Sequence, residues 1–286
     1  MRELLKDKTF SEERALYNSK NIHLINCKFQ GEEDGESALK ESRNIIIEDT
    51  LMDLRYPLWH DYKVSLIKVT MTNNCRAALW YSKNINIRDS QLHGIKALRE
   101  CKKILIETSN INSPEFGWKS KNISINDCAL ISEYAFLESK NINLTNVNFE
   151  GKYAFQYVNN LIIDSSVLNT KDAFWHAKNV VVKNSIIKGE YLGWYSENLT
   201  FINCHIVGTQ PLCYCKELTL IDCTMEKCDL SFEYSNVNAK IKGEIESIKN
   251  PLDGVITCDN VKEIIFTKDA KIPCLGKVVV NNKIKN

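Results

Sequence analysis

Apolar residues recur along most of this chain in a unit of nineteen residues. In the stretch KNINLTNVNF, Ile142 and Leu144 are apolar at a spacing of two, which is the period of a β-strand with one buried face. A second and a third apolar segment follow in each unit, and helical spacing is sustained nowhere. The pattern therefore predicts three short strands per unit.

The units follow one another from Lys20 to Ser235. Their first residues are Lys20, Arg43, Lys63, Lys83, Lys102, Lys121, Lys140, Asn159, Lys178, Glu197 and Lys216. A unit this short cannot bury its own apolar face, so successive units must stack. We expect an all-β fold: a single-stranded, right-handed parallel β-helix of about twelve coils, each of about 19–20 residues. A left-handed β-helix is built on six-residue segments, and nineteen is not a multiple of six.

The repeat runs through nearly the whole length, which predicts one domain over residues 1–286. We assign residues 1–10 to an N-terminal cap, 11–235 to regular coils, and 236–286 to degenerate coils with a C-terminal cap. The insert GEEDGE, Gly31 to Glu36, is expected to form a solvated loop.

Two columns of asparagine and aspartate mark the corners of the coils, because both residues tolerate the left-handed backbone of a sharp turn. The first column is Asn21, Asn44, Asn84, Asn122, Asn141, Asn160, Asn179 and Asn198, and the second is Asn26, Asp49, Asp89, Asp127, Asn146, Asn184, Asn203 and Asp222. Stacked amides can also hydrogen-bond along the axis.

The third segment usually pairs a small residue with a bulky one, as in Ala154-Phe155. Three coils reverse this order, namely Phe116-Gly117, Leu192-Gly193 and Leu230-Ser231. Strand neighbours point to opposite faces, so the reversal predicts a local bend at which both residues reach the same space.

Eleven cysteines occur in the chain, and several replace serine, threonine or valine in a column of small residues. That column is Cys27, Thr50, Thr70, Ser90, Ser109, Cys128, Val147, Ser166, Ser185, Cys204 and Cys223. We expect small buried side chains and reduced thiols. The opening MRELLKDKTF has no apolar core between its charges and is not read as a secretory signal, so a cytoplasmic location is expected.

Charge is balanced, with 37 Lys and Arg against 36 Asp and Glu. This composition predicts no nucleic-acid partner and no attraction to a membrane surface. The chain has no paired C-x-x-C element, phosphate-cradling glycine loop or nucleophile elbow. We therefore expect no cofactor and no metal, and the catalytic residues, if the chain has any, are unknown.

Aromatic residues provide the main candidate for a site. All five tryptophans fall in one column, which also contains Lys40, Arg99 and Gln156 and so is expected to face outward. The aromatics concentrate in three coils, and the candidate ligand-binding residues are Tyr153, Asp172, Trp175, His176, Tyr191, Trp194 and Tyr195. Asp172 is expected to be a hydrogen-bonding centre between tyrosines. The alternatives are an aromatic ladder that stiffens the sheet and a strip buried in a symmetric homodimer.

Several stretches resemble an uncharacterised bacterial family. They are GEYLGW (Gly189 to Trp194), LCY (Leu212 to Tyr214), FEYS (Phe232 to Ser235), NPLDG (Asn250 to Gly254), ERALYNSKN and AFWHAKNV (Ala173 to Val180). The resemblance implies a right-handed β-helix similar in outline to pectate lyases, and it supplies no catalytic residues. Some members carry a hydrogenase-component label, but the paired C-x-x-C thiolates of a nickel–iron site are absent here.

These observations favour a non-catalytic scaffold or binding protein whose outward aromatic strip holds a carbohydrate or a protein partner. The alternative is a carbohydrate-active enzyme, a polysaccharide lyase or glycoside hydrolase, with an unrecognised site. The outward columns contain no facing pair of carboxylates of the kind a hydrolase uses.

Overall fold

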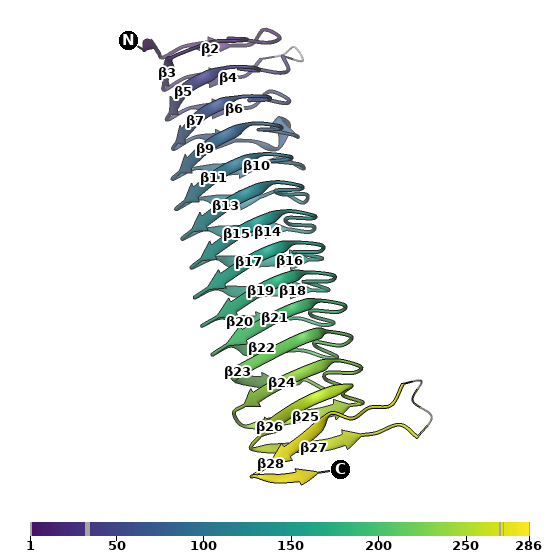
Figure 1. The fold of residues 1–286 in the computed structure, drawn as a ribbon. Helices are drawn as coiled ribbons and strands as arrows, with labels where there is room; N and C mark the ends of the chain where they lie inside the picture. Colours follow the sequence, from purple (N-terminus) through teal and green to yellow (C-terminus); the bar gives the residue numbers. More distant parts are fainter. Residues whose placement is uncertain (1, 32–34, 269, 271, 286) are drawn as a thin grey trace. The chain divides into compact units, whose positions relative to one another are not determined.

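The chain folds into a right-handed parallel β-solenoid of about 14 turns in a computed structural model (Figure 1). The structure describes residues 2–31, 35–268, 270 and 272–285. The predicted fold class is confirmed. Residues 32–34 of the predicted loop, and positions 1, 269, 271 and 286 in the predicted caps, lie outside the described residues.

Contacts divide the chain into two compact units, residues 1–143 and residues 144–286. The boundary falls inside strand β15 (Lys140–Thr145). The expected single domain stays a prediction. Within the described residues, no helix has the length and apolar character needed to cross a membrane.

In unit 1 (residues 1–143), each coil contributes a first and a second strand. The first strands are β1 (Glu3–Lys6), β3 (Ile22–Ile25), β5 (Arg43–Glu48), β7 (Tyr62–Ile67), β9 (Lys83–Arg88), β11 (Lys102–Glu107) and β13 (Lys121–Asn126). The second strands are β2 (Thr9–Phe10), β4 (Lys28–Phe29), β6 (Leu51–Met52), β8 (Thr70–Met71), β10 (Gln91–His93), β12 (Asn110–Asn112) and β14 (Ala129–Ser132). A 3-10 helix, η1 (Asn73–Cys75), follows β8.

Unit 2 (residues 144–286) repeats the scheme and then becomes irregular. One parallel ladder contains β17 (Asn159–Asp164), β19 (Lys178–Lys183), β21 (Glu197–Ile202), β23 (Lys216–Glu226), β24 (Asn236–Ile241), β26 (Asp253–Cys258) and β28 (Lys277–Val280). The other contains β16 (Asn148–Lys152), β18 (Val167–Lys171), β20 (Ile186–Lys188) and β22 (His205–Val207). Strand β22 also pairs with the C-terminal part of the long β23. A separate pair is β25 (Glu244–Lys249) with β27 (Asn260–Ile265), and β29 (Lys283–Lys285) returns antiparallel to β28.

The estimate of twelve coils is low because strands also form in the predicted N-terminal cap and throughout the predicted degenerate coils and C-terminal cap. Strand β1 pairs in parallel with β3, and Glu3 lies opposite Ile22, which is the usual nineteen-residue register. Beyond residue 235, β24, β26 and β28 continue the first-strand ladder. Apolar periodicity is weak in these segments, so counting apolar columns misses them.

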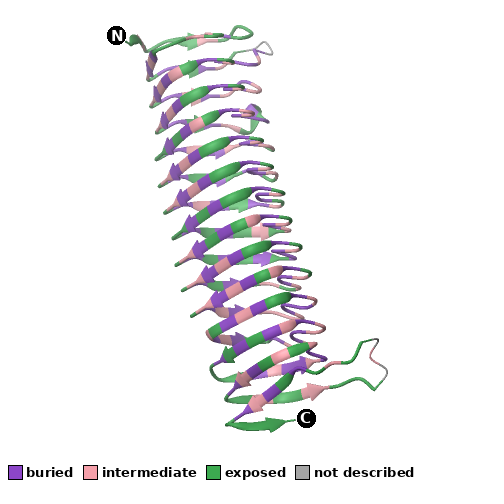
Figure 2. Ribbon diagram, in the orientation of Figure 1, coloured by how far each residue is buried: buried purple, intermediate pink, exposed green. Residues whose placement is uncertain are grey.

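The core lies between the strands of each coil, as the spacing predicts. Ile85 pairs with Ile104 and Ile87 with Ile106 across β9 and β11, and all four side chains are buried. Buried residues alternate with exposed and intermediate ones along the strands in Figure 2. The asparagine and aspartate corners are confirmed as well: Asn84 has a φ of 57° and Asp89 a φ of 50°.

The third segment of a regular coil is a turn, so the prediction of a third strand is wrong. In one such segment Tyr153, Phe155 and Tyr157 have φ values of 56°, 62° and 56°. Alternate left-handed residues turn the backbone, and the adjacent Ala154 and Phe155 are both fully buried. Apolar spacing does not report φ, which is why the segment resembles a strand in the sequence.

The prediction that both residues of a reversed pair reach the same buried space is confirmed in two of the three coils. Phe116 and Gly117 are both buried, and a Cβ on Gly117 would lie 2.8 Å from Cδ1 of Phe136 in the next coil. Leu192 and Gly193 are buried likewise. The third example is wrong, because Leu230 is only half-buried.

At Leu230 the repeat shifts by one residue. Ser231 and Phe232 are the fully buried pair, and they keep the usual small–bulky order. Ser235 follows Cys215 by twenty residues rather than nineteen, so counting nineteen from the coil before misaligns the pair.

A ladder of buried hydroxyl, thiol and carboxyl groups lies between most turn segments and the strands that follow them. We call it the serine ladder; its members are Ser42, Asp61, Ser82, Cys101, Ser120, Ser139, Ser196, Cys215 and Ser235. The backbone N–H of Cys101 donates to Oγ of Ser120 at 3.0 Å, and the N–H of Ser120 donates to Oγ of Ser139 at 3.0 Å. The Ser139 hydroxyl in turn donates to the carbonyl of Gly117 at 2.6 Å. Each member thereby satisfies buried backbone groups of earlier coils.

The column of small residues predicted from the sequence forms a second ladder of this kind. The N–H of Ser90 donates to Oγ of Ser109 at 3.1 Å, and the N–H of Ser109 donates to Sγ of Cys128 at 3.4 Å. The prediction is wrong at Thr70, which is exposed, whereas Val69 is buried and donates its N–H to Oγ of Ser90. The step from Arg43 to Tyr62 is nineteen residues and the step from Tyr62 to Lys83 is 21, so giving both coils twenty residues shifts the alignment by one.

Burial explains why cysteine can replace serine at equivalent positions of these two ladders. Ten cysteines are buried and Cys274 is half-buried. Burial raises the pKa of the Cys101 thiol to about 12 and that of Cys213 to about 12. Both groups are therefore neutral small side chains at physiological pH. The reduced state of all eleven thiols stays a prediction.

The packing at Gly117 predicts the effect of a substitution there. Gly117→Phe should lower the free energy of unfolding by about 1–3 kcal/mol, because the added ring meets Phe136 in a filled space. Its control is the double variant F116A/G117F, which restores the small–bulky order of the next coil and conserves volume. Chemical denaturation should show the double variant to be more stable than G117F. If G117F is as stable as wild type, the conclusion that residue 117 faces the filled space beside Phe136 is wrong.

Asp61 predicts a pH dependence. Its Oδ1 accepts the N–H of Ser42 at 2.8 Å, but Oδ2 is buried without a partner, and burial raises the pKa of Asp61 from 3.8 to about 8. The folded chain therefore holds a proton that the unfolded chain releases, and this contribution to stability falls as pH rises from about 4 to about 8.

Asp61→Ser should remove that dependence, since serine is the usual residue of the ladder. We expect the variant to melt at a higher temperature than wild type at pH 8 and to show a flatter melting profile between pH 5 and pH 8. Asp49→Asn, at an exposed corner, is the control and should leave the profile unchanged. A profile of D61S that is parallel to that of wild type would disprove the assignment.

Candidate binding surface on the turn segments

The tryptophan column of unit 2 is half-buried. Trp175 and Trp194 stack with ring centroids 5.5 Å apart and planes inclined by 4°. Nε1 of Trp175 donates to the carbonyl of Tyr191 at 2.7 Å, and Nε1 of Trp194 donates to that of Gln210 at 2.9 Å. Each indole therefore satisfies a turn carbonyl sixteen residues later and covers the next ring. This geometry is that of a structural column.

Other residue types at the same position make equivalent contacts. Gln156 donates its amide to the carbonyl of Asp172 at 3.4 Å, again sixteen residues later. In unit 1, the Arg99 guanidinium lies over Trp80 at 5.1 Å and over Trp118 at 5.7 Å. Planar or amide groups can thus replace indole, which explains why this column varies without being fully exposed.

The next column outward is more accessible. Tyr157 and His176 stack at 4.9 Å with planes 9° apart, and His176 and Tyr195 stack at 5.2 Å with planes 10° apart. The stack continues through Tyr214 at 4.9 Å and Tyr234 at 5.9 Å. We call these five residues the ring ladder. Tyr157 is 53% exposed and Tyr195 47%.

Three ring-ladder residues, Tyr157, Tyr214 and Tyr234, are absent from the predicted site. Tyr157 precedes His176 by nineteen residues, Tyr214 follows Tyr195 by nineteen, and Tyr234 follows Tyr214 by twenty. The repeat spacing could have identified all three. The sequence pattern instead favours the tryptophan column, because Lys, Arg and Gln share that column and predict that it is exposed.

The third column holds the predicted carboxylate. Asp172 is 8% exposed, and burial raises its pKa although Lys171 lies nearby. Its backbone N–H donates to the carbonyl of Glu190 at 3.0 Å. Lys171 binds the Glu190 carboxylate at 2.8 Å and lies 5.3 Å from the centre of the Tyr191 ring. Asp172 is therefore placed beneath the surface, and its role as a hydrogen-bonding centre for a ligand stays a prediction.

Ring contacts join most of the predicted site residues. Trp194 contacts Tyr191 at 5.6 Å and Tyr195 at 6.3 Å, in addition to Trp175. His176 joins through Tyr195. Tyr153 belongs to the preceding turn and lies beside the Lys152 ammonium, 5.3 Å from its ring centre.

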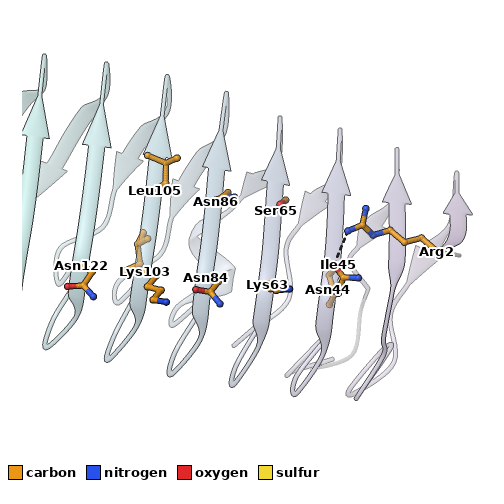
Figure 3. Close-up of a pocket in the computed structure, with 11 residues that line it drawn as sticks. Arg2, Asn44, Ile45, Lys63, Ser65, Asn84, Asn86, Lys103, Leu105 and Asn122 are labelled. Atoms are coloured by element: carbon orange, nitrogen blue, oxygen red, sulfur yellow. Dashed lines mark hydrogen bonds between the residues drawn. The ribbon is translucent and has the colours of Figure 1, made fainter.

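Unit 1 carries a shallow groove of about 510 Å³ across the first strands (Figure 3). Lys63 and Lys103 alternate along it with Asn44, Asn84 and Asn122, and Arg2 reaches Asn44 with a hydrogen bond of 2.8 Å. None of the described residues that line this groove carries a carboxylate. Sequence reasoning treated the asparagines as corner residues alone.

No cluster of three or more His, Cys, Asp or Glu side chains among the described residues could hold a metal ion. The candidate binding surfaces are the stacked rings of unit 2 and the basic groove of unit 1.

Residues 3–279 match the model of a family described as "Protein of unknown function (DUF3737)", and no curated protein matches. Among solved structures, the chain is similar to PfbA, a surface adhesin of Streptococcus pneumoniae, with 10% identity and a TM-score of 0.48, covering 99% of this chain and 90% of that one.

The chain is also similar to two further solved structures. One is a tailspike mutant of the E. coli bacteriophage HK620 in complex with a hexasaccharide, with 10% identity, a TM-score of 0.42, and coverage of 91% and 62%. The other is the A-module of the Azotobacter vinelandii mannuronan C-5 epimerase AlgE6, with 12% identity, a TM-score of 0.35, and coverage of 97% and 87%. The chain belongs to the DUF3737 family, which confirms the recognition of an uncharacterised β-helix family.

The geometry of the tryptophan column gives a prediction. Trp175→Ala combined with Trp194→Ala should lower the melting temperature, because it removes a stacked pair and two N–H···O bonds to turn carbonyls. Tyr195→Phe is the control: it keeps the ring stack and should melt like wild type. If the tryptophan double variant melts like wild type, the column has no structural role.

Proposed function

We propose that this protein is a non-catalytic β-helix binding protein whose ring ladder holds a carbohydrate chain. The observation that carries the proposal is the exposed stack of nearly parallel rings formed by Tyr157, His176 and Tyr195. Stacking covers the ring faces, so the ladder presents ring edges and polar tips. Each coil adds one phenol hydroxyl or imidazole nitrogen, spaced by about 4.8 Å along the axis.

A row of this kind suits a linear ligand with repeated hydroxyl groups. Tyrosine combines an apolar ring with a hydroxyl that both donates and accepts hydrogen bonds. Its side chain loses little conformational entropy on binding, particularly when the ring is already held in a stack. The half-buried tryptophans beneath the ladder support it, since Trp194 contacts both Tyr195 and Tyr214.

We also propose a cytoplasmic location, which the cysteines at serine positions favour, because a reducing compartment keeps such thiols free. The proposal includes no nucleic-acid partner, no membrane partner and no cofactor. The enzyme alternative predicts that a bound glycan is cleaved or eliminated, which a product assay on the same glycan would detect.

The test removes the polar tips and keeps the rings. The triple variant Y157F/H176F/Y195F should fold like wild type and lose neutral-glycan affinity by about tenfold or more, because three hydrogen bonds of about 0.5–1.5 kcal/mol each are lost. A glycan array would identify the ligand, and calorimetry would measure the affinity. Tyr17→Phe, an exposed tyrosine outside the ladder, is the matched control.

Two outcomes would contradict the proposal. In one, the triple variant binds the glycan as tightly as wild type. In the other, wild type binds no glycan and forms a dimer that the triple variant loses; the occupant of the ladder is then a second copy of the chain.

A further inference from the structure

Four lysines lie in a row at the start of consecutive first strands in unit 1. This lysine ladder consists of Lys83, Lys102, Lys121 and Lys140. Lys83 lies opposite Lys102 in the parallel register, and Lys102 lies opposite Lys121. All four side chains are exposed. The backbones of neighbouring lysines in the row are thus about one strand spacing, or about 4.8 Å, apart.

The row has no internal compensation. Among the described residues, no carboxylate forms an ion pair with any of the four. Two other lysines of unit 1 are paired: Lys96 binds Glu115 at 3.2 Å and Lys119 binds Glu138 at 3.6 Å. Like charges directly opposite one another on neighbouring strands are destabilising. Repulsion between neighbouring ammonium groups of this row therefore destabilises the fold.

The same position in unit 2 shows the compensated arrangement. Lys178 lies opposite Glu197, and Glu197 lies opposite Lys216. Lys178 Nζ binds the Glu197 carboxylate at 2.9 Å. A carboxylate thus fits this position of the coil, so the geometry of the turn does not require the run of lysines in unit 1.

The row lines a groove of about 560 Å³. Its other lining residues are His60, Tyr81, Glu100, Lys119 and Glu138. The two carboxylates are engaged by cations, Glu138 by Lys119 and Glu100 by Arg99 at 3.8 Å. The groove therefore offers four uncompensated ammonium groups in a line.

One end of the groove carries an aromatic pair. His60 and Tyr81 stack at 4.8 Å with planes inclined by 17°. Two more lysines lie one residue further along their strands: Lys103 follows Lys102, and Lys63 follows Tyr62. Both line the neighbouring groove shown in Figure 3. Basic side chains consequently extend over both sides of this edge of unit 1.

We propose that this groove binds a linear acidic polysaccharide, with about one carboxylate facing each lysine. Ammonium and carboxylate form charge-assisted hydrogen bonds, and a regular row of cations matches a polymer with an acidic group on each sugar. Binding of single-stranded nucleic acid uses a stacking ring for each of several bases, whereas this groove has a single aromatic pair. The site is independent of the ring ladder, since the two share no residue and the ring ladder is proposed to bind through neutral hydrogen bonds.

The experiment compares two forms of one polymer on the full chain. The probes are de-esterified oligogalacturonate and its fully methyl-esterified form, with oligothymidylate as a third ligand. Wild type should bind the acidic form, bind the esterified form at least about tenfold more weakly, and lose affinity between 50 and 200 mM salt, because the contacts are ionic. Calorimetry measures each affinity.

The variant K102Q/K121Q should bind the acidic probe at least about tenfold more weakly, since two charge-assisted hydrogen bonds are lost. Its melting temperature should equal or exceed that of wild type, because the substitution relieves repulsion. K102R/K121R keeps the charges and should retain binding. Lys178→Gln, at the same coil position in unit 2, is the control and should not change the affinity.

Unchanged affinity in K102Q/K121Q, or no binding of the acidic probe at low salt, would overturn the proposal. Tighter binding of oligothymidylate than of oligogalacturonate would overturn it in favour of nucleic acid. The ring-ladder variant Y157F/H176F/Y195F should bind the acidic probe like wild type. Failure at the ring ladder and failure at the lysine ladder are therefore separate results.

Discussion

Hydrogen bonds between buried side chains and the backbone at the corners of each coil are the interaction on which this solenoid depends. A left-handed conformation costs a residue other than glycine roughly 1–2 kcal/mol, and each regular coil contains several of them. A corner also buries backbone groups that a straight strand would pair. Ser120 satisfies both sides of one corner, accepting the N–H of Cys101 at 3.0 Å and donating to the Leu98 carbonyl at 3.1 Å. Since donor and acceptor belong to different coils, each coil stabilises its neighbour.

The aromatic columns follow from the same corners. Tyr157, His176 and Tyr195 have φ values of 56°, 55° and 60°, so the backbone directs each ring outward at the same point of its coil. Repetition then brings the rings into contact. Stacking and the indole N–H bonds stabilise turns that have no strand ladder of their own, and the ring edges remain accessible. One set of side chains thus supports the turn and provides the candidate surface.

The sequence was sufficient for the repeat, the parallel strands and the corner residues, because these depend on spacing and on the backbone preferences of asparagine. It failed where a property depends on backbone direction. Ala154 and Phe155 are apolar neighbours in either a strand or a turn, and only their φ values distinguish the two structures. Trp175 was interpreted as exposed because polar residues share its column, whereas the structure shows that Arg99 and Gln156 make half-buried contacts equivalent to those of indole. Irregular coil lengths caused the error at Thr70.

The lysine ladder was missed for a different reason. The net charge of +1 averages over the whole chain, but the register places residues nineteen apart side by side. A local choice, such as lysine rather than glutamate at one position of the coil, therefore becomes a row of charges with a fixed spacing. In unit 1 this row is Lys83 to Lys140, whereas in unit 2 Glu197 interrupts it and neutralises Lys178. The ring ladder arises from the same register. Both rows repeat with the strand spacing of about 4.8 Å, so each presents identical contacts at regular intervals. Such a surface gains little from a compact ligand that meets one rung, and it gains one further contact for each repeat of a linear polymer.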